Sequence, residues 1–197
     1  MKRSILVSIL MVFLSLSSVL LNAGNAEASR MNPALLVMDV QNAYLPYMSE
    51  QDKKQGMEMI NYTIALFRQN HFPVIRIYHT DPARGPQEGT ETFAYPDTIA
   101  VKNDDQKIVK HFANGFKKTD LDKILKEKGI NTLFLCGLSA TGCVLATYHG
   151  AYDFDYKVFM VKNALISHNS ELTKAVQEIC PTIDYYALKL LLENANN

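Results

Sequence analysis

Short apolar runs alternate with longer amphipathic stretches from residue 34 onward. Apolar, β-branched runs bounded by turn residues are typical of buried strands, and apolar residues at helical spacing are typical of surface helices. The pattern predicts strands at residues 34–39, 73–78, 107–109, 132–136, 157–161 and 182–185. It predicts helices at residues 50–70, 119–128, 141–154 and 170–179, and a helix-like end at 188–194. This alternation predicts a three-layer α/β/α Rossmann-like sandwich with a mostly parallel sheet of about six strands.

The first 28 residues follow a different pattern. A basic start precedes an apolar run over residues 5–21, and Ala-Glu-Ala at 26–28 offers small residues at a cleavage site. These features predict an export signal peptide over residues 1–28 and one domain over residues 29–197. The alternative is an uncleaved membrane anchor, which is disfavoured because the run is short for a membrane span. We therefore expect an exported protein, periplasmic or secreted, without a stable membrane anchor after cleavage.

Composition narrows the possible partners. Hydrophobic residues make up 48% of the chain and charged residues 20%, as is typical of a soluble globular domain. Lys and Arg together number 20 and balance the 20 Asp and Glu, so we expect no nucleic-acid partner. The three cysteines are too few for a disulfide scaffold. Cys136, within an apolar strand, and Cys180, before Pro181, are expected to be structural.

The third cysteine has a different setting. Cys143 follows the Gly-rich turn that joins the predicted strand 132–136 to the predicted helix 141–154. Unpaired backbone N–H groups and the helix dipole stabilise a thiolate at a helix N-terminus. The sequence therefore predicts a reactive nucleophile at this position.

Two further polar residues end predicted strands. Asp39 closes the run that begins at Leu35, and Lys110 ends the step Ile-Val-Lys. Taken singly, such residues are more often turn formers or solvated side chains. Open α/β sheets, however, bind ligands beyond the carboxyl ends of their strands. Together with Cys143, the two residues form a candidate site.

Three segments around these residues form recognisable motifs: Leu-Val-Met-Asp-Val-Gln-Asn at 36–42, Lys-His-Phe-Ala-Asn-Gly-Phe at 110–116, and Gly-Leu-Ser-Ala-Thr-Gly-Cys-Val at 137–144. With them the chain resembles the isochorismatase-like cysteine hydrolases, which include nicotinamidases, N-carbamoylsarcosine amidohydrolases and ureidoacrylate hydrolases. The order and spacing of the three segments match, and the resemblance covers about residues 33–185.

The resemblance implies a triad of Asp39, Lys110 and Cys143, in which Asp39 takes the thiol proton and Lys110 holds the carboxylate. It also implies a non-proline cis peptide between Leu138 and Ser139. The backbone N–H groups of Ser139 and Cys143 would then face the oxyanion. Relatives commonly form dimers or tetramers, so the resemblance further implies a homo-oligomer.

Metal binding is where the chain departs from nicotinamidases. Those relatives carry an Asp-x-His pair and a further His after the second strand, whereas this chain has Tyr-His-Thr-Asp-Pro at 78–82 and no further histidine until His111. His79 with Asp81 is a poor metal site, so we expect no metal and no other cofactor. A Cys-His pair of papain type is disfavoured because His149 diverges from Cys143 around the helix.

The leading hypothesis is an exported cysteine hydrolase that cleaves a C–N bond of a small amide, ureido or carbamoyl compound through a thioester. Tyr44, His79, Phe116 and Tyr148 are candidate walls of a small aromatic pocket. Isochorismate (vinyl ether) hydrolysis is one alternative, and a non-catalytic or redox-active secreted binding protein is another. Residues 80–102, rich in Pro and Gly, form a surface or lid segment.

Overall fold

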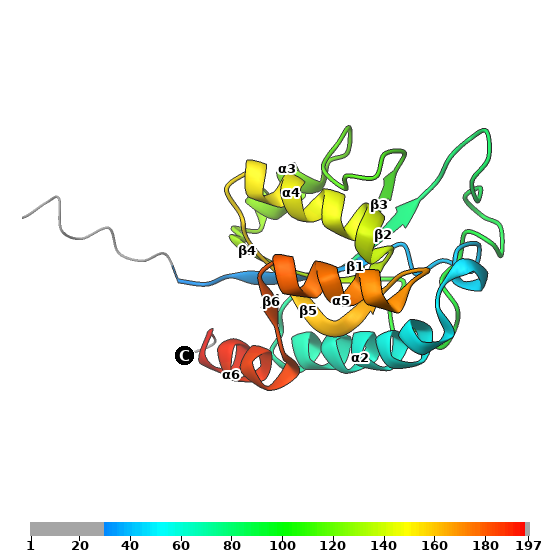
Figure 1. Cartoon of the computed structure of the whole chain (residues 1–197). Coiled ribbons are helices and arrows are strands. Elements are labelled where there is room, and N and C mark those ends of the chain that lie inside the picture. Colours follow the sequence, from blue (N-terminus) through cyan, green and yellow to red (C-terminus); the bar gives the residue numbers. More distant parts are fainter. Residues whose placement is uncertain (1–29, 196–197) are drawn as a thin grey trace, which may run out of the picture. The chain divides into compact units, whose positions relative to one another are not determined.

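A computed structural model of the chain describes residues 30–195, whose core is a six-stranded sheet (Figure 1). The strand order is β3-β2-β1-β4-β5-β6, and every pair of neighbours is parallel. The strands are β1 (Pro33–Met38), β2 (Val74–His79), β3 (Gln106–Lys110), β4 (Thr132–Leu138), β5 (Lys157–Ile166) and β6 (Thr182–Ile183). The predicted parallel sheet of about six strands is confirmed.

Helices cover both faces of this sheet. They are α2 (Glu50–Gln69), α3 (Leu121–Glu127), α4 (Leu145–Asp153), α5 (Ser170–Ile179) and α6 (Tyr185–Ala195). In Figure 1, α3 and α4 lie on one side of the sheet, and α2 and α6 lie on the other. A short 3₁₀ helix (Leu45–Tyr47) follows β1, and a π-helical turn (Ala140–Val144) precedes α4. The predicted α/β/α sandwich is therefore correct.

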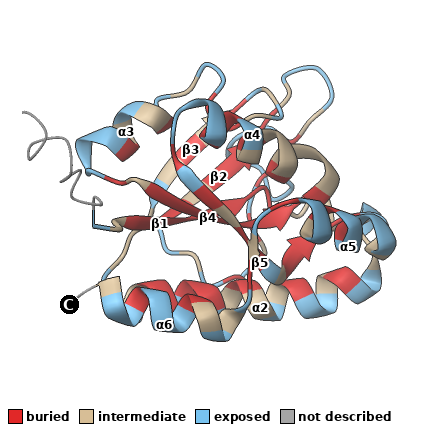
Figure 2. Ribbon diagram, turned by 60° about the vertical axis from the view of Figure 1, so that its left-hand side comes forward, coloured by how far each residue is buried: buried red, intermediate tan, exposed pale blue. Residues whose placement is uncertain are grey.

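The central strand β1 joins the two halves of the core. All six of its residues are buried, as expected for a parallel strand covered on both faces (Figure 2). Leu36 and Met38 pack in the cluster beneath α3 and α4, whereas Leu35 and Val37 pack against α2 and α6. The strict alternation fixes the register, so the end of β1 emerges at a defined point of the sheet edge.

Local features explain two of the predicted boundaries that were wrong. The strand predicted at 182–185 ends at Ile183, because the Asp184 carboxylate accepts hydrogen bonds from the backbone N–H of Tyr186 and Ala187 and caps α6. Strand β5 extends to Ile166, well past the predicted residue 161. Its pairing with β4 shifts register before Gly137, and Asn163 within β5 has a φ of 64°.

The predicted surface or lid segment, residues 80–102, is anchored to the sheet. Phe93 and Tyr95 are buried, and both rings pack against Tyr78, with ring centroids 4.9 and 4.5 Å away. The Tyr95 hydroxyl lies 2.9 Å from the carbonyl oxygen of Val37 and 2.6 Å from that of Ile77. It has one proton to donate, so the two carbonyl groups share it. In this conformation residues 80–102 pack against the sheet.

The predicted signal peptide, residues 1–28, lies outside the described residues. Within residues 30–195, no helix has both the length and the apolar character of a membrane span.

We expect Tyr95→Phe to lower the free energy of unfolding by about 1–2 kcal/mol, because it removes the donor that two buried carbonyl groups share. Urea denaturation followed by circular dichroism measures the change. Tyr186→Phe is the matched control, because Tyr186 is 78% exposed, and a change within about 0.5 kcal/mol is expected there. Equal stabilities of Tyr95→Phe and the wild type would contradict this account of the anchor.

Candidate active site

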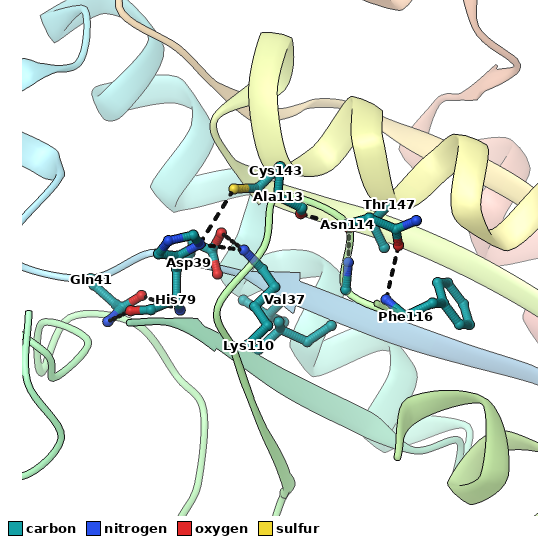
Figure 3. Close-up of polar contacts among 12 residues, drawn as sticks. Val37, Asp39, Gln41, His79, Lys110, Ala113, Asn114, Phe116, Cys143 and Thr147 are labelled. Carbon is teal, nitrogen blue, oxygen red and sulfur yellow. Dashed lines mark hydrogen bonds and ion pairs between the residues drawn. The ribbon is translucent and has the colours of Figure 1, made fainter. Parts of the chain in front are cut away.

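Four neighbouring strands deliver one polar side chain each to the same edge of the sheet (Figure 3). Asp39 directly follows β1, His79 ends β2, Lys110 ends β3, and Cys143 lies in the π-helical turn after β4. Because parallel strands all point the same way, their carboxyl ends meet at this edge. The structure thus brings together the three residues predicted as a triad, and it adds a histidine.

Asp39 and Lys110 form a buried ion pair. Lys110 Nζ lies 2.7 Å from Asp39 Oδ2, and the two side chains are 0% and 2% exposed. Apart from this ion pair, the Asp39 carboxylate has no hydrogen-bond partner within residues 30–195. Burial raises the pKa of Asp39 above its ordinary value, and the charge of Lys110 opposes this rise. Asp39 is thus a stronger base than a surface aspartate.

The turn that carries Cys143 depends on close backbone approach. Gly137 has a φ of 112°, and a Cβ at this position would collide with the backbone of Met38. The peptide bond between Leu138 and Ser139 is cis, as the resemblance implies. The Ser139 carbonyl then accepts hydrogen bonds from the N–H groups of Gly142 and Val144. This tight turn directs the Cys143 side chain toward Asp39, with a carboxylate oxygen and Sγ within 4.8 Å.

The surroundings of Cys143 favour the protonated thiol in the free site. Burial, followed by the negative charge of Asp39, raises the pKa of Cys143 from 9.0 to about 12, although Lys110 opposes the rise. Burial and the neighbouring carboxylate both oppose the stabilisation of a thiolate that a helix N-terminus provides. The expectation of a thiolate stabilised by the helix dipole is therefore wrong. The neighbouring carboxylate has to accept the proton during the reaction.

His79 makes contacts that the sequence reasoning did not find. Its Nδ1 lies 3.0 Å from Lys110 Nζ and 4.0 Å from Cys143 Sγ. The contact between His79 and Lys110 follows from the strand register, because the two are paired residues at the ends of β2 and β3. The other histidines considered, His111 and His149, are both exposed.

A cavity of about 170 Å³ opens beside the thiol. Tyr44 and His79 line it, as predicted. Its other lining residues are Asp39, Met48, Leu138, Ser139 and Cys143. Met48 was not foreseen, because it comes from the loop after β1, which no motif marks.

Phe116 and Tyr148 do not line this cavity, in contrast to the expectation. Phe116 stacks on Phe154 in the core beneath α3 and α4, with ring centroids 5.2 Å apart. Its segment folds back on α4, because the Gly115 N–H donates to Thr147 Oγ1 at 2.8 Å. Tyr148 lines a separate cavity of about 440 Å³.

Three of the site residues carry atoms that can coordinate a metal ion. Ligand atoms of Asp39, His79 and Cys143 all lie within 4.8 Å of one another. The ammonium of Lys110, however, already contacts Asp39 at 2.7 Å and His79 at 3.0 Å. A metal ion bound there would face this buried positive charge, so the donor set does not fit a resident metal.

Comparison with known proteins gives the family. The isochorismatase domain model matches residues 33–178. The isochorismatase family protein YddQ of Bacillus subtilis is 30% identical over 139 residues, 68% of this chain and 77% of that protein. A secreted isochorismatase effector of Verticillium dahliae is 23% identical over 143 residues, 71% of this chain and 75% of that protein. N-carbamoylsarcosine amidase from Thermoplasma acidophilum matches with a TM-score of 0.64 and 26% identity, covering 78% of this chain and 95% of that one.

The chain therefore belongs to the isochorismatase family of hydrolases, and its relatives include amidases.

The pKa of the thiol predicts how Cys143 reacts with iodoacetamide. Alkylation of the wild type should be slow at pH 8 and rise about tenfold per pH unit up to about pH 12. Asp39→Asn removes a charge that raises the pKa of Cys143 and leaves Lys110 beside the sulfur, so the pKa falls. We expect the alkylation rate at pH 8 to rise at least about tenfold in this variant.

Mass spectrometry of the modified peptide measures the alkylation rate. The Cys143→Ala variant, which lacks this thiol, shows which signal comes from Cys143. A wild-type thiol that reacts as fast as free cysteine, or an Asp39→Asn variant that reacts more slowly than the wild type, would contradict the assignment of a protonated resting state.

Proposed function

We propose that this protein hydrolyses the C–N bond of a small amide, ureido or carbamoyl compound through a thioester on Cys143. One observation carries the proposal: a buried base and a thiol from separate strand ends line one small cavity, and an ammonium from a third strand end is paired with the base. This is the arrangement of a nucleophile activated by an adjacent base that a third group holds in place.

The chemistry follows from the protonation states. On attack, the thiol proton passes to Asp39 and the sulfur bonds to the carbonyl carbon. Asp39 then gives the proton to the departing nitrogen, which leaves as ammonia or an amine. Water attacks the thioester with Asp39 again as the base, releasing the acid and restoring the thiol. Lys110 keeps Asp39 in place, and the N–H groups of Ser139 and Cys143 are the proposed oxyanion donors.

The cavity favours a compact, uncharged substrate. Its volume of about 170 Å³ suits a small molecule. No arginine is among its lining residues in the described chain, and the ammonium of Lys110 is already paired with Asp39. A substrate carboxylate would lack a cationic partner here. This argues against isochorismate, which carries two carboxylates.

Export and assembly complete the proposal. The pattern of residues 1–28 and the name of the secreted Verticillium relative support an exported protein. On α6, Tyr186 is 78% exposed and Leu190 is 62% exposed, which supports association of copies of this chain. N-terminal sequencing of the secreted protein tests the cleavage after residue 28, and light scattering tests the homo-oligomer.

Cys143→Ala should lower turnover of every amide substrate by at least about 1,000-fold, and Asp39→Asn should do the same, because nucleophile and base act as a unit. Ammonia release from a panel of small neutral amides measures it. Cys180→Ala is the matched control, because it removes a thiol that lies outside the cavity and should leave turnover unchanged. Turnover that survives in Cys143→Ala would refute the thioester mechanism, and a wild type inactive on the whole panel would favour a binding or redox protein.

A further inference from the structure

We propose that His79 binds the substrate: Lys110 fixes its ring in the tautomer that carries the proton on Nε2, and this N–H donates a hydrogen bond to an acceptor on the substrate beside the scissile carbonyl. The inference deepens the proposed function and rests on it. It adds a specificity-determining residue to the triad.

The tautomer follows from the contact with Lys110. An ammonium group has three donors and no acceptor, so the nitrogen 3.0 Å from Lys110 Nζ has to offer its lone pair. That nitrogen is Nδ1, and a neutral imidazole then carries its proton on Nε2. A doubly protonated ring would place two cations side by side. Burial and the charge of Lys110 both lower the pKa of His79, which keeps the ring neutral.

The ring is held at the cavity from several sides. Gln41 is fully buried, and its side chain clamps the His79 backbone, donating to the carbonyl oxygen at 3.0 Å and accepting from the N–H at 2.8 Å. The ring of Tyr44 meets the imidazole edge-on, with centroids 6.2 Å apart. Both residues line the cavity beside Cys143. His79 is therefore a positioned donor at the cavity wall.

The donor defines a class of substrate. The Asp39–Lys110 pair is neutral in sum and the imidazole is neutral, so the site matches a neutral ligand with a second acceptor. Tyr44, Met48 and Leu138 supply the apolar remainder of the wall. A compact amide with a second carbonyl group meets these conditions, as small diamides do. A plain aliphatic amide of the same shape leaves the buried N–H unpaired.

Malonamide and isovaleramide form a matched pair of probes. They have nearly the same shape, but isovaleramide replaces the second carboxamide by a branched alkyl end. Binding is measured on full-length Cys143→Ala protein, which cannot form the thioester, by following the His79 ring nitrogens in long-range ¹H–¹⁵N spectra. We expect Nε2 protonated and Nδ1 bare, and malonamide bound about three- to tenfold more tightly than isovaleramide.

Two further substitutions, each added to Cys143→Ala, separate the two ring nitrogens, with binding followed by calorimetry. In His79→Asn the amide reaches the place of Nδ1 only, so the preference for malonamide should vanish. In His79→Gln the amide reaches the place of Nε2, so the preference should persist. A protonated Nδ1, equal affinity for the two probes, or the same preference in His79→Asn as in its parent would overturn the inference.

These readouts do not require turnover. If an active Cys143→Ala variant refuted the thioester mechanism, the tautomer of His79 and the preference for malonamide could still be tested. Conversely, failure of the preference would leave the triad chemistry intact.

Discussion

The buried ion pair between Asp39 and Lys110 is the constraint on which the rest of the site depends. Each charge alone would be costly to bury, and removing one partner of such a pair typically destabilises a protein by about 3–5 kcal/mol. The two residues come from β1 and β3, which flank β2, so the pair ties three strand ends together. His79, the end of β2, lies between them and contacts the same ammonium. The pair thus holds the base Asp39 close to the donor His79, and the two charges of the pair sum to zero.

The same pair determines the state of the nucleophile. Asp39 raises the pKa of Cys143 more than Lys110 lowers it, and burial adds the largest contribution. Both effects favour the protonated thiol in the free site, so in the proposed mechanism the nucleophile forms as the carbonyl carbon is attacked. A protonated thiol also oxidises slowly, since oxidation follows thiolate character. For a protein predicted to be exported into an oxidising compartment, this state preserves the catalytic group.

Much of the fold and part of the site could be predicted from the sequence. The apolar runs located the strands, and strand ends such as Asp39 and Lys110 pointed to one sheet edge, because parallel topology leaves little choice. The state of the Cys143 thiol could not be predicted, because it depends on burial and on a neighbouring charge from another strand. The contact of His79 with Lys110 depends on strand register. Phe116 was misplaced because one hydrogen bond, from Gly115 to Thr147, folds its loop away from the cavity.

The proposed reacting groups and the other residues that line the cavity come from different parts of the fold. The reacting groups lie on strand ends and on a tight turn, where backbone pairing and close packing fix them. The cavity residues Tyr44 and Met48 come from the loop after β1. This loop is held against residues 80–102, because the backbone N–H groups of Asn42 and Ala43 donate to the carbonyl groups of residues 94 and 92. Loops tolerate substitution better than buried strands do. Substitutions in this loop can therefore change the cavity while the strand ends stay fixed, and His79 is the exception because it is a strand residue that also lines the cavity.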